Sequence, residues 1–170
     1  MVMQATKAFS GSRERQAQAL VTVVRCGEER GLVGLRLVDD KHASAGEYFI
    51  PFAVSNPTST HGREFAYAGV VAALDRLRAL KVTRLLLLTD DSALVNELER
   101  QIEPPRDLFL QYVILGCKLN EFVRAKLVVT PSERLEELRA KTANLAATIY
   151  RDHVADGREQ PAMLPLAHAI

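Results

Sequence analysis

The sequence predicts an α/β fold, with one mixed five-stranded sheet and helices on both of its faces. Three short apolar, β-branched runs come first, at the spacing of hairpins. Helical periods and apolar runs then alternate along the chain. One later run, Val82–Thr89, is apolar at nearly every position, as a strand covered on both faces would be. The resulting order, β-β-β-α-β-α-α-β-α, is typical of three antiparallel strands that continue into alternating α and β elements of the same sheet.

The first half of the chain supplies the three antiparallel strands and one helix. The strands are expected at 19–27, Gly31–Val38 and Glu47–Val54, and Pro51 favours an edge strand or a bulge for the third. Residues 63–80, "REFAYAGVVAALDRLRAL", carry apolar residues at helical spacing and predict the first helix.

The second half alternates helices and strands. After Val82–Thr89 we expect a helix from about Ser92 to Gln101, stopped by Pro104 and Pro105. A helix at Asp107–Phe122 and a strand in "AKLVVT" follow. The last helix is expected to open at Thr130 as N-cap, with Pro131 at the first position and Glu133 in a capping box, and to end near Val154.

Length and composition indicate one globular domain. A chain of 170 residues buries one core, and we place the domain at 19–154, between a flexible N-terminal arm (1–18) and a flexible C-terminal tail (155–170). The net charge is +1, so any basic surface must be local. No apolar run approaches the roughly 20 residues of a membrane span, and no secretory signal is expected. Cys26 and Cys117 form no CxxC motif, which predicts reduced, buried thiols, a cytoplasmic location and no zinc site.

This element order carries two further motifs. "GREF" opens the first helix, and "TDDSALV" follows the fourth strand. Together they resemble the ribonuclease H family, above all its compact reverse-transcriptase-like branch, over about residues 20–150. The resemblance implies that Glu64 is the family's glutamate in the first helix and that Asp91 is its aspartate after the fourth strand, with Asp90 in that place if the register slips by one.

The family's chemistry is phosphodiester hydrolysis by two metal ions held by four carboxylates, and magnesium or manganese suits such a site. In this resemblance Cys26 stands at the first carboxylate's position, where a soft thiol does not suit magnesium. Glu28 or Glu29 would need a changed turn to substitute. One alignment of the last helix with the family places Glu136 at the position of the fourth carboxylate. Another alignment places Ala143 at that position. The acidic site is therefore incomplete, and among single changes Cys26→Asp is the one expected to restore some cleavage activity.

Each of these residues also has a purely structural interpretation. Asp91 before an apolar period is a preferred N-cap, Glu64 in a first turn complements the helix dipole, and Glu136 fits a solvated helix face. Asp39 and Asp40 fit a hairpin turn. The four histidines show no ligand spacing. Candidate nucleic-acid contacts are basic side chains in the N-terminal arm, beside Glu64 and on the last helix: Lys7, Arg13, Arg15, Arg63, Arg134, Arg139 and Lys141.

The leading expectation is a ribonuclease H-like module that is catalytically degenerate and binds nucleic acid, an RNA–DNA hybrid or DNA, or serves as a scaffold. The first alternative is an active magnesium-dependent nuclease that cleaves the RNA of RNA–DNA hybrids, with Glu64, Asp91 and Glu136 as catalytic residues. The second is a homodimeric protein-interaction module that uses the tail or an exposed sheet edge. In every case the fold predicts that Glu64 and Asp91 approach each other near Cys26.

Overall fold

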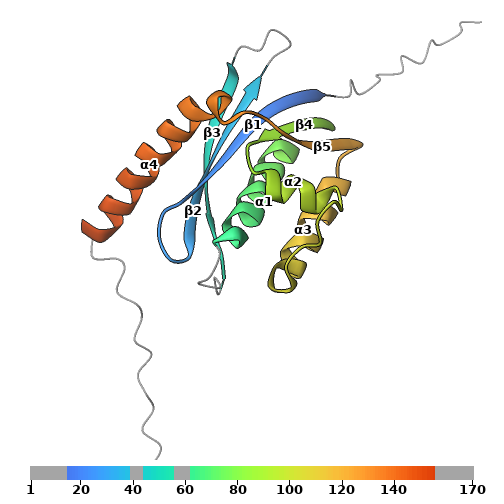
Figure 1. Cartoon of the computed structure of the whole chain (residues 1–170). Coiled ribbons are helices and arrows are strands. Elements are labelled where there is room, and N and C mark those ends of the chain that lie inside the picture. Colours follow the sequence, from blue (N-terminus) through green and yellow to red (C-terminus); the bar gives the residue numbers. More distant parts are fainter. Residues whose placement is uncertain (1–14, 39–43, 56–61, 156–170) are drawn as a thin grey trace, which may run out of the picture.

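The computed structural model describes residues 15–38, 44–55 and 62–155 of the chain, and its elements follow the expected order (Figure 1). Five strands form one sheet in the order β3-β2-β1-β4-β5. Their bounds are β1 Gln16–Arg25, β2 Arg30–Val38, β3 Ser44–Ala53, β4 Arg84–Thr89 and β5 Arg124–Val129. The α/β class and the mixed five-stranded sheet are confirmed.

Strand β4 lies in the interior of the sheet, as its four consecutive leucines predict. It pairs in parallel with β1 on one side and with β5 on the other. The β1–β2 and β2–β3 pairs are antiparallel. Strand β3 is an edge strand, in agreement with the expectation from Pro51.

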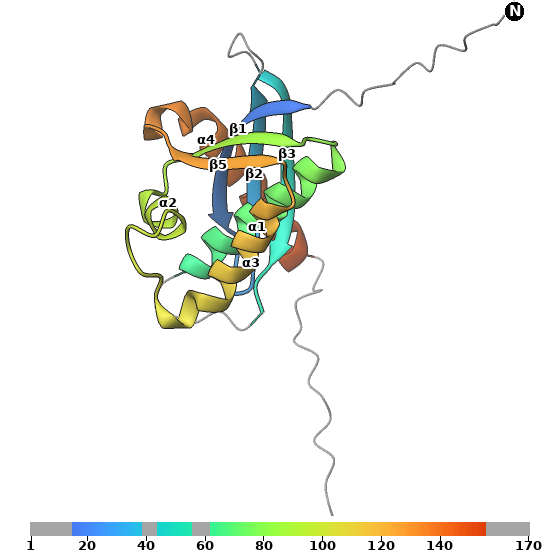
Figure 2. The same ribbon diagram turned by 90° about the vertical axis from the view of Figure 1, so that its right-hand side faces the viewer.

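Four α-helices cover the two faces of the sheet: α1 Arg63–Ala79, α2 Ser92–Leu98, α3 Phe109–Asn120 and α4 Glu136–Ala155. Short 3-10 turns, η1 Arg106–Leu108 and η2 Ser132–Arg134, precede α3 and α4. Helices α1 and α3 pack side by side on one face, and α4 lies across β1 and β2 on the other (Figures 1 and 2). Within the ranges that the structure describes, no helix is both long and apolar enough to cross a membrane.

Alternation along the strands divides the core into two clusters. Ala19 and Val21 of β1 face α1, together with Leu85 and Leu87 of β4. Leu20 and Leu88 face α4, where they meet Leu135 and Leu138. Because both faces of β4 are apolar, the strand requires helices on both sides, which is the physical basis of the three-layer arrangement.

Several element boundaries differ from the expected ones. Strand β1 begins at Gln16, inside the segment assigned to the N-terminal arm, because Gln16–Gln18 pair with the first half of β4. Helix α2 ends at Leu98, before the prolines are reached, and Arg100 takes a left-handed backbone conformation with φ 59°. A left-handed residue just after the last turn is a common way to end a helix.

The N-cap expected at Thr130 is not formed. Thr130 is buried, at 3% exposure, and its hydroxyl has no hydrogen-bond partner among the described residues. The chain makes the η2 turn instead, and α4 begins at Glu136. The expectation of two buried thiols is also wrong, because Cys117 on α3 is exposed and Cys26 is only partly buried.

Gly34 permits close contact between α4 and β2, which gives the first prediction. A Cβ at Gly34 would overlap the hydroxyl of Thr142 and lie 3.1 Å from Cγ2 of Thr22. We expect Gly34→Ala to lower the free energy of unfolding by about 1–3 kcal/mol through overpacking. Adding Thr142→Ala should recover part of that loss, because it removes the overlapping hydroxyl. Urea unfolding of the two single variants and the double variant measures this coupling, and strictly additive losses would contradict the packing described.

Candidate functional site

A hollow of about 220 Å³ lies at the carboxyl end of β4. Three segments meet there: the second half of β1, the first turn of α1 and the turn from β4 into α2. Helix α4 adds one side chain. The lining residues are Thr22, Val23, Arg25, Gly62, Phe65, Ala66, Val70, Thr89, Asp90, Asp91, Leu94 and Arg139. This corner, called the Asp90 pocket below, contains two of the carboxylates that the sequence singles out.

Asp91 caps helix α2. Its Oδ1 accepts a hydrogen bond of 2.9 Å from the backbone N–H of Leu94. Its own N–H donates to the hydroxyl of Thr89 at 3.2 Å. The capping interpretation of Asp91 is therefore confirmed, and one of its carboxylate oxygens is engaged with the backbone.

Asp90 forms an ion pair with Arg139 of α4. The two residues are 49 positions apart in the sequence, and α4 brings the guanidinium to the end of β4. The side chain of Asp90 is 24% exposed and that of Arg139 is 43% exposed, so solvent screens the pair in part. A side-chain cation thus lies beside the carboxylate that would otherwise be available to a metal ion.

Glu97 of α2 is a buried acid whose carboxylate is held by neighbouring side chains. It is 3% exposed and accepts hydrogen bonds from both Nη atoms of Arg63 and from the hydroxyl of Tyr67. Burial would raise the pKa of Glu97, but the bonds from Arg63 and Tyr67 outweigh it, so the pKa is lowered. Burial and the Glu97 bond raise the pKa of Tyr67. The carboxyl group of Glu97 therefore stays ionised, and its role is to hold the structure together.

Sequence reasoning missed Glu97, although one signal could have found it. Glu97 follows Leu94 by three positions, so the helical period of α2 places it on the buried side of the helix. An acid at a core position requires a cation within reach. Arg63, proposed as a nucleic-acid contact, is that cation.

Glu64 and Glu136, the other proposed ligands, are not among the residues that line the Asp90 pocket. Glu64 is buried in the first turn of α1, at 3% exposure, and does not line the Asp90 pocket. Glu136 is exposed at the start of α4. Over residues 15–38, 44–55 and 62–155, no three His, Cys, Asp or Glu side chains lie close enough to hold a metal ion.

Cys26 lies in a different hollow from Asp91. It lines an apolar hollow of about 390 Å³ with Pro51, Phe52 and Ile149, among others. Strand β1 pairs with β4 only as far as Leu20, opposite Leu88, and continues past the end of β4. The β1 residues that reach the Asp90 pocket are consequently Thr22, Val23 and Arg25. Burial raises the pKa of the Cys26 thiol, which disfavours the reactive thiolate.

The proposed basic contacts are distributed over several surfaces. Arg139 lines the Asp90 pocket together with Arg25, which was not among the candidates and lies over the ring of Phe65 at 4.8 Å. Arg15 donates to the carbonyl of Leu80, at the other end of the sheet. Arg134 is exposed on η2, and Lys141 pairs with Glu47 and Glu137. Lys7, Arg13, His42, His61, His168, Asp39 and Asp40 lie outside the described residues.

Solved structures with the same arrangement include three ribonucleases H. Ribonuclease H1 of Halobacterium salinarum NRC-1 superposes with a TM-score of 0.60 at 17% identity, over 71% of this chain and 89% of that one. The N-terminal ribonuclease H domain of Rv2228c from Mycobacterium tuberculosis gives 0.59 at 18% identity, over 81% and 99%. LC11 ribonuclease H1, solved with an RNA/DNA hybrid, gives 0.56 at 13% identity, over 69% and 87%.

The chain has a ribonuclease H-like fold. The resemblance noted in "GREF" and "TDDSALV" is therefore confirmed at the level of fold. Neither a scan of protein-family models nor a search of curated proteins found a match.

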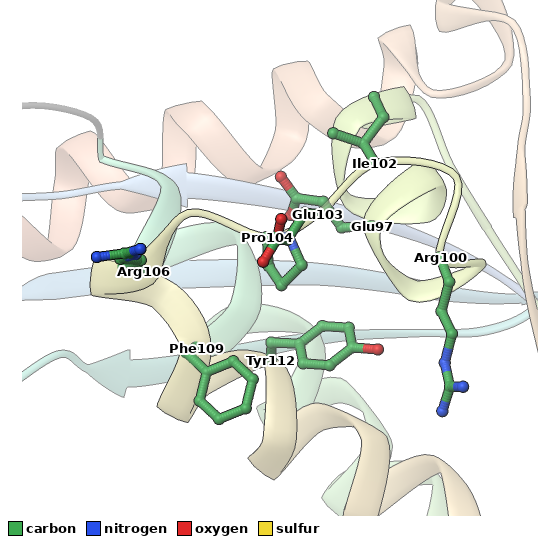
Figure 3. Close-up of a pocket in the computed structure, with 8 residues that line it drawn as sticks. All are labelled: Glu97, Arg100, Ile102, Glu103, Pro104, Arg106, Phe109 and Tyr112. Atoms are coloured by element: carbon green, nitrogen blue, oxygen red, sulfur yellow. The ribbon is translucent and has the colours of Figure 1, made fainter.

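A further hollow of this ribonuclease H-like domain, with a volume of about 600 Å³, lies between α2 and α3 (Figure 3). Phe109 and Tyr112 stack at 6.2 Å along one wall. Arg100 and Arg106 lie on opposite sides of it in Figure 3. Glu97, near the C-terminal end of α2, lines this hollow, whereas Asp91 and Leu94, at the N-terminal end, line the Asp90 pocket.

The cap at Asp91 gives the second prediction. Asp91→Ala removes the acceptor for the Leu94 N–H, so it should lower the free energy of unfolding by about 1 kcal/mol. Asp91→Asn is the matched control, because asparagine caps as well as aspartate while carrying no charge. Chemical unfolding of both variants separates the cap from the charge. An Asp91→Ala variant as stable as the parent protein would refute the capping role.

Proposed function

We propose that this ribonuclease H-like domain binds nucleic acid, an RNA–DNA hybrid or DNA, without cutting it. The observation that carries the proposal is that both acids of the Asp90 pocket, and Glu97 nearby on α2, are engaged within the protein. Asp91 caps α2, Asp90 pairs with Arg139, and Glu97 holds Arg63 and Tyr67.

A metal ion would have to displace these partners. Magnesium gives up its water shell reluctantly and is held by several oxygen ligands of high negative charge. Arg139 neutralises Asp90, and β1 contributes Thr22, Val23 and Arg25 to the pocket but no carboxylate. Thr22 and Val23 are thus better candidates than Cys26 for the position where the family has its first carboxylate. Cys26→Asp would add a charge to the separate apolar hollow, so we do not expect it to restore a metal site.

Arginine side chains supply the binding half of the proposal. Arg25 and Arg139 line the Asp90 pocket and can donate to phosphate oxygens, which guanidinium groups recognise well. LC11 ribonuclease H1, which shares the fold, is described in complex with an RNA/DNA hybrid. A cytoplasmic location fits this function and the two free cysteines.

The third prediction tests binding and cleavage in the same samples. Purified protein should bind a labelled RNA–DNA hybrid equally well in EDTA and in magnesium or manganese, and should release no cleavage product. Arg25→Ala together with Arg139→Ala should weaken binding about tenfold or more, because two phosphate contacts are lost. Arg100→Ala together with Arg151→Ala, which removes the same charge elsewhere, is the control. Magnesium-dependent cleavage by the parent protein would refute the proposal and support the nuclease alternative.

A specific surface favours a second function, self-association through α3. Four large apolar side chains of this helix are exposed on one stripe: Phe109 59%, Leu110 66%, Val113 40% and Ile114 42%. Exposed apolar patches of this kind mark interaction sites. Charges of both signs flank the stripe, Arg106 and Asp107 at one end and Lys118 and Glu121 at the other. A rim of both signs is complementary to itself, so we propose a second copy of the chain as the occupant.

The fourth prediction concerns the oligomeric state. The parent protein should sediment as a dimer at micromolar concentration, and Leu110→Ser with Ile114→Ser should sediment as a monomer. These side chains are exposed, so the fold should not change. Leu145→Ser, at a 38% exposed site on α4, is the control. A monomeric parent protein, or dissociation by the α4 change alone, would exclude α3 as the interface.

A further inference from the structure

The apolar hollow that Cys26 lines, called the Cys26 hollow below, lies beside the last turns of α4. Its volume is about 390 Å³, and Ile149 is the α4 residue in its lining. The rest of the lining comes from the β1–β2 turn, from the start of β2 and from the end of β3. Among the described residues that line it, only Arg30 is charged. The Cys26 hollow shares no lining residue with the Asp90 pocket, so it is separate from the site of the proposed function.

The buried stripe of α4 leads into this hollow. Leu138, Thr142 and Ala146 follow one another at steps of four residues, and all three are buried. Ile149 continues the stripe by one further step, but it is only half-buried, and Pro51 across the hollow is exposed. The sheet thus covers the stripe as far as Ala146 and leaves an apolar surface around Ile149 that a further apolar segment can cover.

The segment that follows α4 has a composition suited to such a surface. It reads "DGREQPAMLPLAHAI" and lies outside the described residues. Its charged residues all lie in 156–160, called the linker below, whereas every residue of 161–167, called the apolar run, is apolar. Burial of Met163, Leu164 and Leu166 would remove three large apolar side chains from water. The two prolines of the apolar run restrict its backbone, which reduces the entropy lost when it binds.

The linker is long enough to bring the apolar run back to the hollow. Ala155, the last residue of α4, is six residues beyond Ile149, which corresponds to about 9 Å along a helix. The five linker residues can span about 17 Å when they are extended. Because the connection is short, the effective concentration of the apolar run at the hollow is in the millimolar range. A contact that would be weak between two molecules is therefore sufficient within one chain.

We propose that the apolar run of the same chain binds in the Cys26 hollow and covers Ile149. Its large apolar side chains pack between α4 and the edge strand β3, and they shield the thiol of Cys26 from solvent. Because Pro51 has no backbone N–H to offer at the edge of β3, side-chain contacts rather than an added strand make the interaction. The bound run holds the C-terminal half of α4 against the sheet.

The two free cysteines distinguish the surfaces that the apolar run could cover. Cys26 lies in the hollow. Cys117 lies three residues after Ile114, so it continues the exposed apolar stripe of α3. A thiol that is covered by a bound segment reacts slowly with DTNB, because access limits its reaction. The labelling rates of the two thiols, assigned with Cys26→Ser and Cys117→Ser variants, therefore report which surface is covered.

The first test replaces the apolar run in the full chain. Met163→Ser, Leu164→Ser and Leu166→Ser together should raise the labelling rate of Cys26 about tenfold, because the tethered run then no longer occupies the hollow. The rate of the α3 thiol should not change. These positions belong to neither core cluster that the structure describes, so the variant should fold.

Serine at the three charged positions of the linker is the matched control and should change neither rate. A synthetic peptide of residues 156–170, added to the variant with three serines in the apolar run, should slow the labelling of Cys26 again. An unchanged rate at Cys26 in that variant, or a change confined to the α3 thiol, would overturn the proposal.

A disulfide trap separates binding within one chain from binding to a second copy. Leu164→Cys in a Cys117→Ser background should form a disulfide with Cys26 under glutathione disulfide, because the bound run brings the two Cα atoms within about 7 Å. The product should migrate as a monomer on a non-reducing gel. Arg158→Cys in the same background is the control and should form little of it. A disulfide-linked dimer would assign the hollow to a second copy, and equal yields from both positions would show an unbound segment; either result overturns the proposal.

Discussion

Strand β4 is apolar on both of its faces, and the rest of the architecture depends on that constraint. A strand of this kind must be covered twice, so α1 and α3 pack on one side of the sheet and α4 packs on the other. The covered strand ends at Thr89, and the chain can return to polar residues only there. Asp90 and Asp91 therefore emerge where α1, α2 and α4 all come near, which is the position at which an α/β sheet usually presents a ligand site.

The acids of this corner are held by the protein itself. A buried carboxylate is costly unless a cation or several donors accompany it. Glu97 meets that requirement through Arg63 and Tyr67, and Asp90 meets it through Arg139. These contacts link α1 to α2 and α4 to the end of β4. The polar side chains of the corner thereby connect helices from both layers of the domain.

Local patterns were sufficient to predict the fold. The β-branched runs, the four leucines of β4 and the helical period of α1 each determine an element without reference to distant residues. The cap at Asp91 was predictable for the same reason, because its partner, Leu94, is three residues away. Element ends were less predictable: α2 ends at a left-handed arginine that no sequence rule indicates, and the buried Thr130 replaces an expected cap by a 3-10 turn.

Long-range pairings could not be predicted from one sequence. The Asp90–Arg139 pair joins residues 49 positions apart, and nothing in either segment indicates the other. The position of Cys26 relative to Asp90 and Asp91 depends on how β1 and β4 pair. Because β1 continues past the end of β4, Cys26 lies beyond these carboxylates. The exposure of the apolar stripe of α3 could not be predicted, because its helical period is the same whether a face meets the sheet or solvent.

The pairing of Asp90 with Arg139 also constrains how the sequence can change over generations. Loss of Arg139 alone would leave Asp90 without its cation and would detach α4 from the end of β4. A carboxylate gained on β1 alone would meet a corner that already holds several arginines. Neither change alone would assemble the set of free carboxylates that a metal ion needs, because the remaining arginines would still engage them. A metal-binding corner would require coupled substitutions on β1 and α4, so this pairing restricts which single mutations can change what the corner binds.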